Sequence, residues 1–147
     1  MNTALHALSP LDGRYQKHAA QLSPFFSEFG LIRYRVLVEV RYFIALSAQN
    51  LKGLPALSDG QAADLERIYS EFSESDAVRI KEIESTINHD VKAVEYFLKE
   101  RFEALGMGDR AEFIHFGLTS QDINNTAIPR SMQDAHRDVV RPALLAI

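Results

Sequence analysis

Apolar residues recur at intervals of three and four along most of this 147-residue chain, and this periodicity constrains the fold more than any other feature. It is clearest after Ser23-Pro24, a pair that suits a helix start, where apolar positions continue to about Gln49. No segment alternates apolar and polar residues as a half-buried strand does. The sequence therefore predicts an all-α fold.

Capping residues mark where other helices should begin. Ser58 and Gln61 have the spacing of a capping box, so we expect a helix from there to about Phe72. Ser73 is a suitable N-cap for the next helix, whose apolar positions continue to Ile87.

Two features of the long helices carry more specific expectations. Arg35 and Glu39 lie four residues apart, so we expect them to pair on the exposed side of their helix, without a role in function. A later helix should run from Thr119 to about Val139 with Pro129 inside it. An interior proline removes a backbone hydrogen bond, which predicts a kink there.

The composition limits the classes of function. A net charge of -4 and a pI near 5.7 argue against a nucleic-acid-binding surface. The chain has no cysteine, which excludes disulfides and a thiol nucleophile. No segment resembles a signal peptide or is long and apolar enough to span a bilayer. We expect a cytoplasmic protein that contacts neither nucleic acid nor membrane.

The stretch Thr86–Tyr96 sets an amide, an imidazole and a carboxylate side by side where a helix is expected to begin. We interpret Asn88 as the N-cap, and Asp90 complements the positive end of the helix dipole. Backbone N–H groups at such an end, with His89 beside them, suit a phosphate or a carboxylate. An ordinary cap with a surface histidine is the alternative reading of this stretch taken alone.

A second helix start follows in the stretch Glu112–Asn125. Thr119 and Asp122 are spaced like a capping box, and only one hydroxyl is needed to cap the helix. Ser120 is therefore expected to be free to donate to a ligand oxygen. Two such helix starts could hold the two ends of a polyanionic molecule.

Two further side-chain patterns are weaker. Glu112 and His115 have a spacing found in metal-binding helical bundles, but the second copy of the motif is missing, so no metal site is expected. We expect His115 to be packed or substrate-adjacent. The third stretch, Ser9–Tyr15, contains Pro, Asp and Gly of a turn followed by Arg14, which could bind a phosphate or carboxylate.

Together the three stretches resemble the adenylosuccinate lyase family of the fumarase/aspartase superfamily, from about residue 9 to about residue 125. The matching motifs are Ser-Pro-x-Asp-Gly-Arg-Tyr, Asn-His-Asp-Val-Lys-Ala-Val-Glu-Tyr and Glu-Phe-Ile-His-Phe-x-x-Thr-Ser-x-Asp-Ile-Asn-Asn, in this order. The resemblance implies an amino-terminal helical domain over residues 1–115 and the start of a central helix-bundle domain over residues 116–147.

The resemblance also implies a reaction. Enzymes of this family eliminate fumarate from adenylosuccinate to leave AMP, and from the succinylated aminoimidazole carboxamide ribotide of purine biosynthesis. They act as homotetramers without a cofactor, and their active sites are built from several subunits. Both substrates carry a phosphate and a dicarboxylate, which is the charge pattern that the two helix starts suit.

Carried over position by position, the resemblance assigns substrate-binding residues in three groups. These are Arg14 and Tyr15 at the nucleotide, Asn88, His89 and Asp90 along the substrate, and Thr119 and Ser120 at the succinyl carboxylates. His89 would orient the bound molecule and support catalysis.

The family's catalytic acid and base are not expected in this chain. The acid is usually a His in a Thr-His motif, and the base is a Ser in a Ser-Ser-x-Met-Pro-x-Lys loop; neither motif occurs here. The apolar pattern also continues to Ile147 without a helix stop. We therefore expect an amino-terminal fragment of the lyase that is inactive alone.

Two other functions remain open from the sequence. One is another fumarate-releasing lyase of the superfamily, such as argininosuccinate lyase or fumarase, although Arg14-Tyr15 and Asn88-His89-Asp90 resemble the nucleotide-specific branch. The other is a helical assembly module without catalytic activity, since an apolar carboxyl-terminal helix needs a partner.

Overall fold

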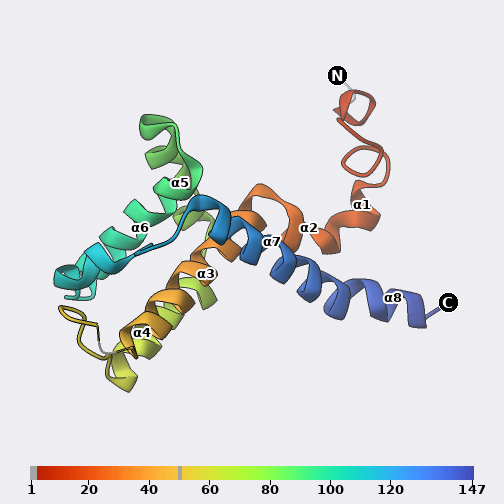
Figure 1. Ribbon diagram of the computed structural model, residues 1–147. Coiled ribbons are helices and arrows are strands. Elements are labelled where there is room, and N and C mark those ends of the chain that lie inside the picture. Colours follow the sequence, from red (N-terminus) through yellow and green to blue (C-terminus); the bar gives the residue numbers. More distant parts are fainter. Residues whose placement is uncertain (1–2, 50) are drawn as a thin grey trace.

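The computed structural model describes residues 3–49 and 51–147, and within these ranges every regular element is a helix (Figure 1). The expected all-α fold is confirmed. The elements in order are η1 (Thr3–His6), α1 (Gln16–Ala19), η2 (Ala20–Leu22), α2 (Ser23–Phe26), α3 (Glu28–Ser47), α4 (Asp59–Ser70), α5 (Glu74–Ile87), α6 (Asp90–Ala104), η3 (Gly108–Phe113), α7 (Ser120–Ala135), the π-helical turn η4 (His136–Val140) and α8 (Arg141–Leu145).

The central element is α3, which packs against α4, α6 and α7. In Figure 1, α4 runs alongside α3, α5 and α6 lie together as a pair, and α7 continues through η4 into α8 as an arm that leaves the rest of the chain. Because α3 contacts helices on several sides, a side chain on its buried face can reach two neighbours at once.

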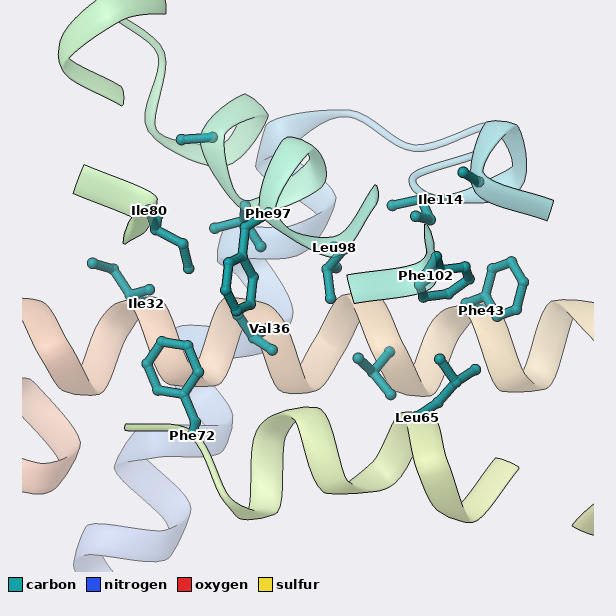
Figure 2. Packing of buried hydrophobic residues seen from close by; sticks show 14 of the residues in the cluster. Ile32, Val36, Phe43, Leu65, Phe72, Ile80, Phe97, Leu98, Phe102 and Ile114 are labelled. Atoms are coloured by element: carbon teal, nitrogen blue, oxygen red, sulfur yellow. The ribbon is translucent and has the colours of Figure 1, made fainter. Parts of the chain in front are cut away.

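Aromatic rings fill the core between α3 and its neighbours. Phe43 of α3 meets Phe102 of α6 edge-on, with ring centroids 4.7 Å apart. Figure 2 shows Leu65 and Phe72 approaching α3 from one side and Phe97 from the other, while Phe72 and Phe97 form a second edge-on pair at 6.1 Å. Such pairs add stability beyond the burial of their area.

The expected helix boundaries around the core are largely confirmed. Ser58 and Gln61 form the complete capping box of α4, and Ser73 forms another with Asp76 at the start of α5. Helix α6 ends just before Gly106, whose φ of 70° lies in the left-handed region that glycine tolerates best.

The single helix expected from Ser23 to about Gln49 is wrong, because the chain forms two helices with a break at Ser27. The extended backbone of Ser27 makes it the N-cap of α3, and its hydroxyl accepts the N–H of Gly30 at 3.1 Å. A side chain at Gly30 would meet the carbonyl oxygen of Pro24 at 2.8 Å, so glycine is what lets α2 fold back this closely onto α3.

Pro129 lies inside α7, as expected, and does not end its α-helical pattern. Helix α7 continues through Pro129 to Ala135, and the departure from α-helix is the π-helical turn just before Pro142. Pro129 and Asn125, whose carbonyl loses its helical donor, are both exposed, so water can satisfy that carbonyl.

Within residues 3–49 and 51–147, no helix has the combination of length and apolar character that crossing a bilayer requires.

Candidate functional site

The start of α6 differs from the expectation in the residue that caps it. Asn88 is not the N-cap; it closes α5 in the left-handed conformation, with φ 55°, where asparagine is one of the few tolerated side chains. The N-cap of α6 is His89, whose Nδ1 accepts the N–H of Lys92 at 3.1 Å. A neutral His89 therefore carries its proton on Nε2, and the side chain is 52% exposed, so this donor is available to a ligand.

Asp90 follows directly and is engaged within the protein. Its Oδ1 accepts the N–H of Val91 at 2.8 Å, and its Oδ2 lies 2.7 Å from a guanidinium nitrogen of Arg35. Burial alone would raise the pKa of Asp90, but the Val91 N–H and the Arg35 charge outweigh it and hold the pKa below its usual value. Asp90 is thus a charged internal partner at the edge of the site.

The start of α7 has the expected pairing of Thr119 with Asp122. The backbone N–H and the hydroxyl of Thr119 both donate to Oδ2 of Asp122, each at 2.8 Å. These two hydrogen bonds hold the pKa of Asp122 below its usual value. The Ser120 hydroxyl makes no hydrogen bond to any residue in the described ranges, so it remains available as a donor.

Arg35 joins the two helix starts. Its Nε donates to Oδ1 of Asn124, in the first turns of α7, at 3.0 Å, while its other contact is Asp90 of α6. The structure therefore brings the stretches around His89 and Ser120 to the same part of α3, beside Arg35. The expected exposed pair of Arg35 with Glu39 is wrong: both residues are buried, and each binds other partners.

Glu39 forms a second buried charge cluster one turn further along α3. Its Oε1 lies 2.5 Å from Nδ1 of His115, while its Oε2 has no hydrogen-bond partner among the described residues. Nε2 of His115 lies 3.8 Å from Oε1 of Glu95, and the other oxygen of Glu95 pairs with Lys92 at 2.6 Å. Burial raises the pKa of Glu39, and the charge of Glu95 adds to this against the opposing effect of His115.

His115 is packed, which agrees with one of the two roles expected for it. It adopts a left-handed backbone conformation, with φ 61°, and its side chain is 13% exposed. No group of three potential metal ligands is found in the described part of the chain. His115 instead fixes the segment that leads into α7.

The burial of Arg35 and Glu39 was not predicted, but the pattern of apolar residues along α3 could have indicated it. Along α3 the buried positions Ile32, Val36 and Val40 recur every four residues. Arg35 and Glu39 each precede one of these positions, so they lie beside the same stripe and not opposite it. Two charges bordering an apolar stripe are expected to need partners.

Arg14 and Tyr15 are not brought to this end of α3. They lie together in the expected turn, with the guanidinium of Arg14 over the Tyr15 ring at 4.6 Å, and both are exposed. Figure 1 shows α1, which follows them, far from α6; residues of α1 and η2 line a hollow with η4 and α8 instead.

A hollow with a volume of about 630 Å³ lies between α3 and α7. It reaches Asp122 but neither His89 nor Ser120, and its walls are mostly apolar, including Leu37 and Ile123. Its character does not match the polar helix starts, so it is separate from the candidate site.

Comparison with known proteins agrees with the motifs. The family model described as "Lyase" matches residues 13–147. The chain is 52% identical to the adenylosuccinate lyase of Dictyostelium discoideum over 144 residues, which cover 95% of this chain and 31% of that protein. It is 45% identical to that of Legionella pneumophila strain Corby over 147 residues (99% and 32%), and 46% identical to that of Escherichia coli K12 over 142 residues (95% and 31%).

The chain spans about a third of the length of these relatives. Its all-helical fold, the order of its motifs and the match over residues 13–147 agree with one another. The chain therefore belongs to the lyase family, within the all-α fumarase/aspartase superfamily.

Proposed function

We propose that this chain is the substrate-binding part of an adenylosuccinate lyase. The reaction eliminates fumarate from adenylosuccinate to give AMP, and from the succinylated aminoimidazole carboxamide ribotide in purine biosynthesis. The observation that carries the proposal is that Arg35 links the two helix starts bearing His89 and Ser120. The relatives named adenylosuccinate lyase support it.

The chemistry needs fixed donors for the negative charge that builds on a substrate carboxylate, besides an acid and a base. This chain supplies two side-chain donors at two helix starts, which are Nε2–H of His89 and the hydroxyl of Ser120. Thr119 contributes by orienting the turn that carries Ser120. Asp90, half-exposed beside His89, pairs with Arg35 at the edge of the site.

Arg14 and Tyr15 serve the nucleotide phosphate in this proposal, although they lie away from His89 in the same chain. Their exposure and distance suit a site that is completed by another copy of the protein. We therefore propose that the active sites are shared between copies. The resemblance to the family further leads us to propose a homotetramer, a cytoplasmic location and a domain boundary at residue 115, after η3. No cofactor is required.

The acid and the base belong to motifs that this sequence does not contain. The chain alone is therefore expected to bind adenylosuccinate or AMP weakly and to release no fumarate. Activity requires the Thr-His and Ser-Ser-x-Met-Pro-x-Lys motifs in addition.

A hybrid enzyme tests this function. Residues 1–147 replace the matching stretch of the E. coli adenylosuccinate lyase, and AMP formation from adenylosuccinate is followed. The hybrid should be active, and His89→Ala should lower kcat/KM by roughly 100-fold, as the loss of one charge-stabilising donor does in other enzymes. His136→Ala removes an exposed imidazole of η4 and is the matched control. A hybrid in which both variants keep full activity would contradict the assignment of His89.

An assembly module without catalysis is the second candidate, favoured by one observation. Leu144 and Leu145 of α8 are 62% and 76% exposed, which is unusual for adjacent leucines in a helix. A folded hybrid that assembles normally but releases no fumarate would favour this reading.

A further inference from the structure

We propose that Arg35 is a positioning residue, which fixes the relative orientation of the first turns of α6 and α7 and thereby the spacing between His89 and Ser120. Its effect on the reaction rests on the proposed lyase function, whereas its effect on the geometry does not. The two effects are measured in separate experiments.

The first support is the geometry of the guanidinium. Arg35 is 6% exposed, its Nε donates to Asn124 at 3.0 Å and a terminal nitrogen lies 2.7 Å from Asp90. The planar guanidinium holds its donors in a fixed fork, so two partners bound by different nitrogens are held at a fixed angle. One of these partners lies at the start of α6 and the other in the first turns of α7.

The second support is the separate anchor formed by Glu39 and His115. His115 precedes α7, and its contact with Glu39 ties that segment to α3 one turn beyond Arg35. Tyr34 of α3 also donates to Asp134 at 3.0 Å, so the far end of α7 has an anchor of its own. Loss of Arg35 should therefore shift the first turns of α7 between His115 and that anchor and leave the core of the chain folded.

Direct binding of substrate by Arg35 is the competing role, and its surroundings argue against it. The side chain is buried, and it forms its ion pair with Asp90 and its hydrogen bond with Asn124. Asp90 is the more exposed partner, at 46%, so the charge of Arg35 is neutralised on the side that faces solvent. Arg35 acts on the site through the groups it holds.

The absence of cysteine allows a direct measurement of this shift. Spin labels on Tyr96→Cys in α6 and Gln121→Cys in α7 occupy exposed positions. Gln121 follows Ser120 directly, so its label reports a displacement of the first turn of α7. Pulsed electron paramagnetic resonance on the doubly labelled chain should give one narrow distance distribution.

Arg35→Lys and Arg35→Met should each broaden or shift that distribution, since neither can bind Asp90 and Asn124 in the same fork. Arg41→Lys is the matched control, because Arg41 lies on the exposed side of α3 and pairs with Glu66. Asn124→Ala, which removes one partner and leaves the charge pair, is the milder variant should Arg35→Met fail to fold. An unchanged distribution in Arg35→Lys and Asn124→Ala would overturn the proposal.

The hybrid lyase supplies the catalytic readout. Arg35→Met should lower kcat on the order of 100-fold, as misplacement by about 1 Å does, with Arg35→Lys intermediate and Arg41→Lys unchanged. A purely structural role would lower the thermal midpoint without changing kcat in the folded variant. If the unmodified hybrid is inactive, the proposed function fails while the distance distribution still decides the role of Arg35. A changed distribution with an unchanged kcat in an active hybrid would overturn the link to the reaction.

Discussion

The core around α3 and the arm formed by η4 and α8 both carry apolar side chains but differ in what they bury. Phe43, Phe97 and Phe102 in the core are each 1% exposed, whereas neither η4 nor α8 contains a buried residue. Helices with the same apolar periodicity thus reach opposite outcomes, depending on whether a neighbour faces the stripe. The core should therefore respond to substitution by losing stability, and the arm should respond by changing its association.

The largest effect is expected for a large-to-small change in the core. Phe43→Ala removes the edge-on partner of Phe102 and leaves a cavity, so the free energy of unfolding should fall by about 3–5 kcal/mol. Phe26→Ala is the control, since Phe26 is 54% exposed. Urea denaturation followed by circular dichroism measures both, and equal losses would break the comparison between buried and exposed aromatic residues.

A smaller effect with a defined sign is expected for Glu39. Its raised pKa means that the folded chain binds more protons than the unfolded chain between the two pKa values. The stability of the parent should therefore fall as pH rises through this window, while Glu39→Gln lacks this loss. The stability of Glu39→Gln relative to the parent should rise with pH.

Glu66→Gln is the control for this pH dependence, because Glu66 is a partly exposed partner of Arg41. Denaturant titrations at a series of pH values give the comparison. If the difference in free energy of unfolding between Glu39→Gln and the parent stayed constant across the pH series, burial would not be destabilising the charged Glu39 carboxyl.

The next effect is expected at the start of α7, the helix that connects the core to the arm. Thr119→Ala removes the hydroxyl that donates to Asp122 at the start of α7, and loss of this hydrogen bond should cost about 1 kcal/mol. Thr126→Ala, in the same helix, removes a hydroxyl that bonds a helical carbonyl and should change stability less. Thermal unfolding of the two variants, side by side, shows whether the cap is as important at α7 as the structure indicates.

The smallest effect on stability is expected at the end of the arm. Leu144→Lys with Leu145→Lys should change the free energy of unfolding by less than about 0.5 kcal/mol, since these side chains are exposed. The same change should reduce self-association, measured by sedimentation velocity over a range of concentrations. Leu8→Lys, at a residue 100% exposed near the other end of the chain, is the control and should leave association unchanged.

Much of the fold could be predicted from the sequence because local signals agreed with the packing. Ser58, Ser73 and Thr119 begin helices by side-chain hydrogen bonds that involve only neighbouring residues, so sequence spacing reveals them. The helix break at Ser27 was not predicted, because it interrupts a continuous apolar pattern and depends on how α2 packs against Gly30.

The candidate site was only partly predictable. The motifs pointed to His89 and Ser120, but the N-cap of α6 was expected at Asn88 and is His89, because the left-handed conformation of Asn88 depends on how closely α5 and α6 follow each other. The contacts of Arg35 span 55 and 89 residues of sequence, and no local rule reveals them. Long-range pairs of buried charges are decided by the tertiary fold.

The capping role of His89 connects ligand occupancy to the order of α6. A ligand that accepts from Nε2 favours the one tautomer in which Nδ1 can also accept the Lys92 N–H. Binding and helix capping then reinforce each other through a single ring. The exchange of the Lys92 amide hydrogen with solvent thus becomes a reporter, within the backbone, of whether the neighbouring site is filled.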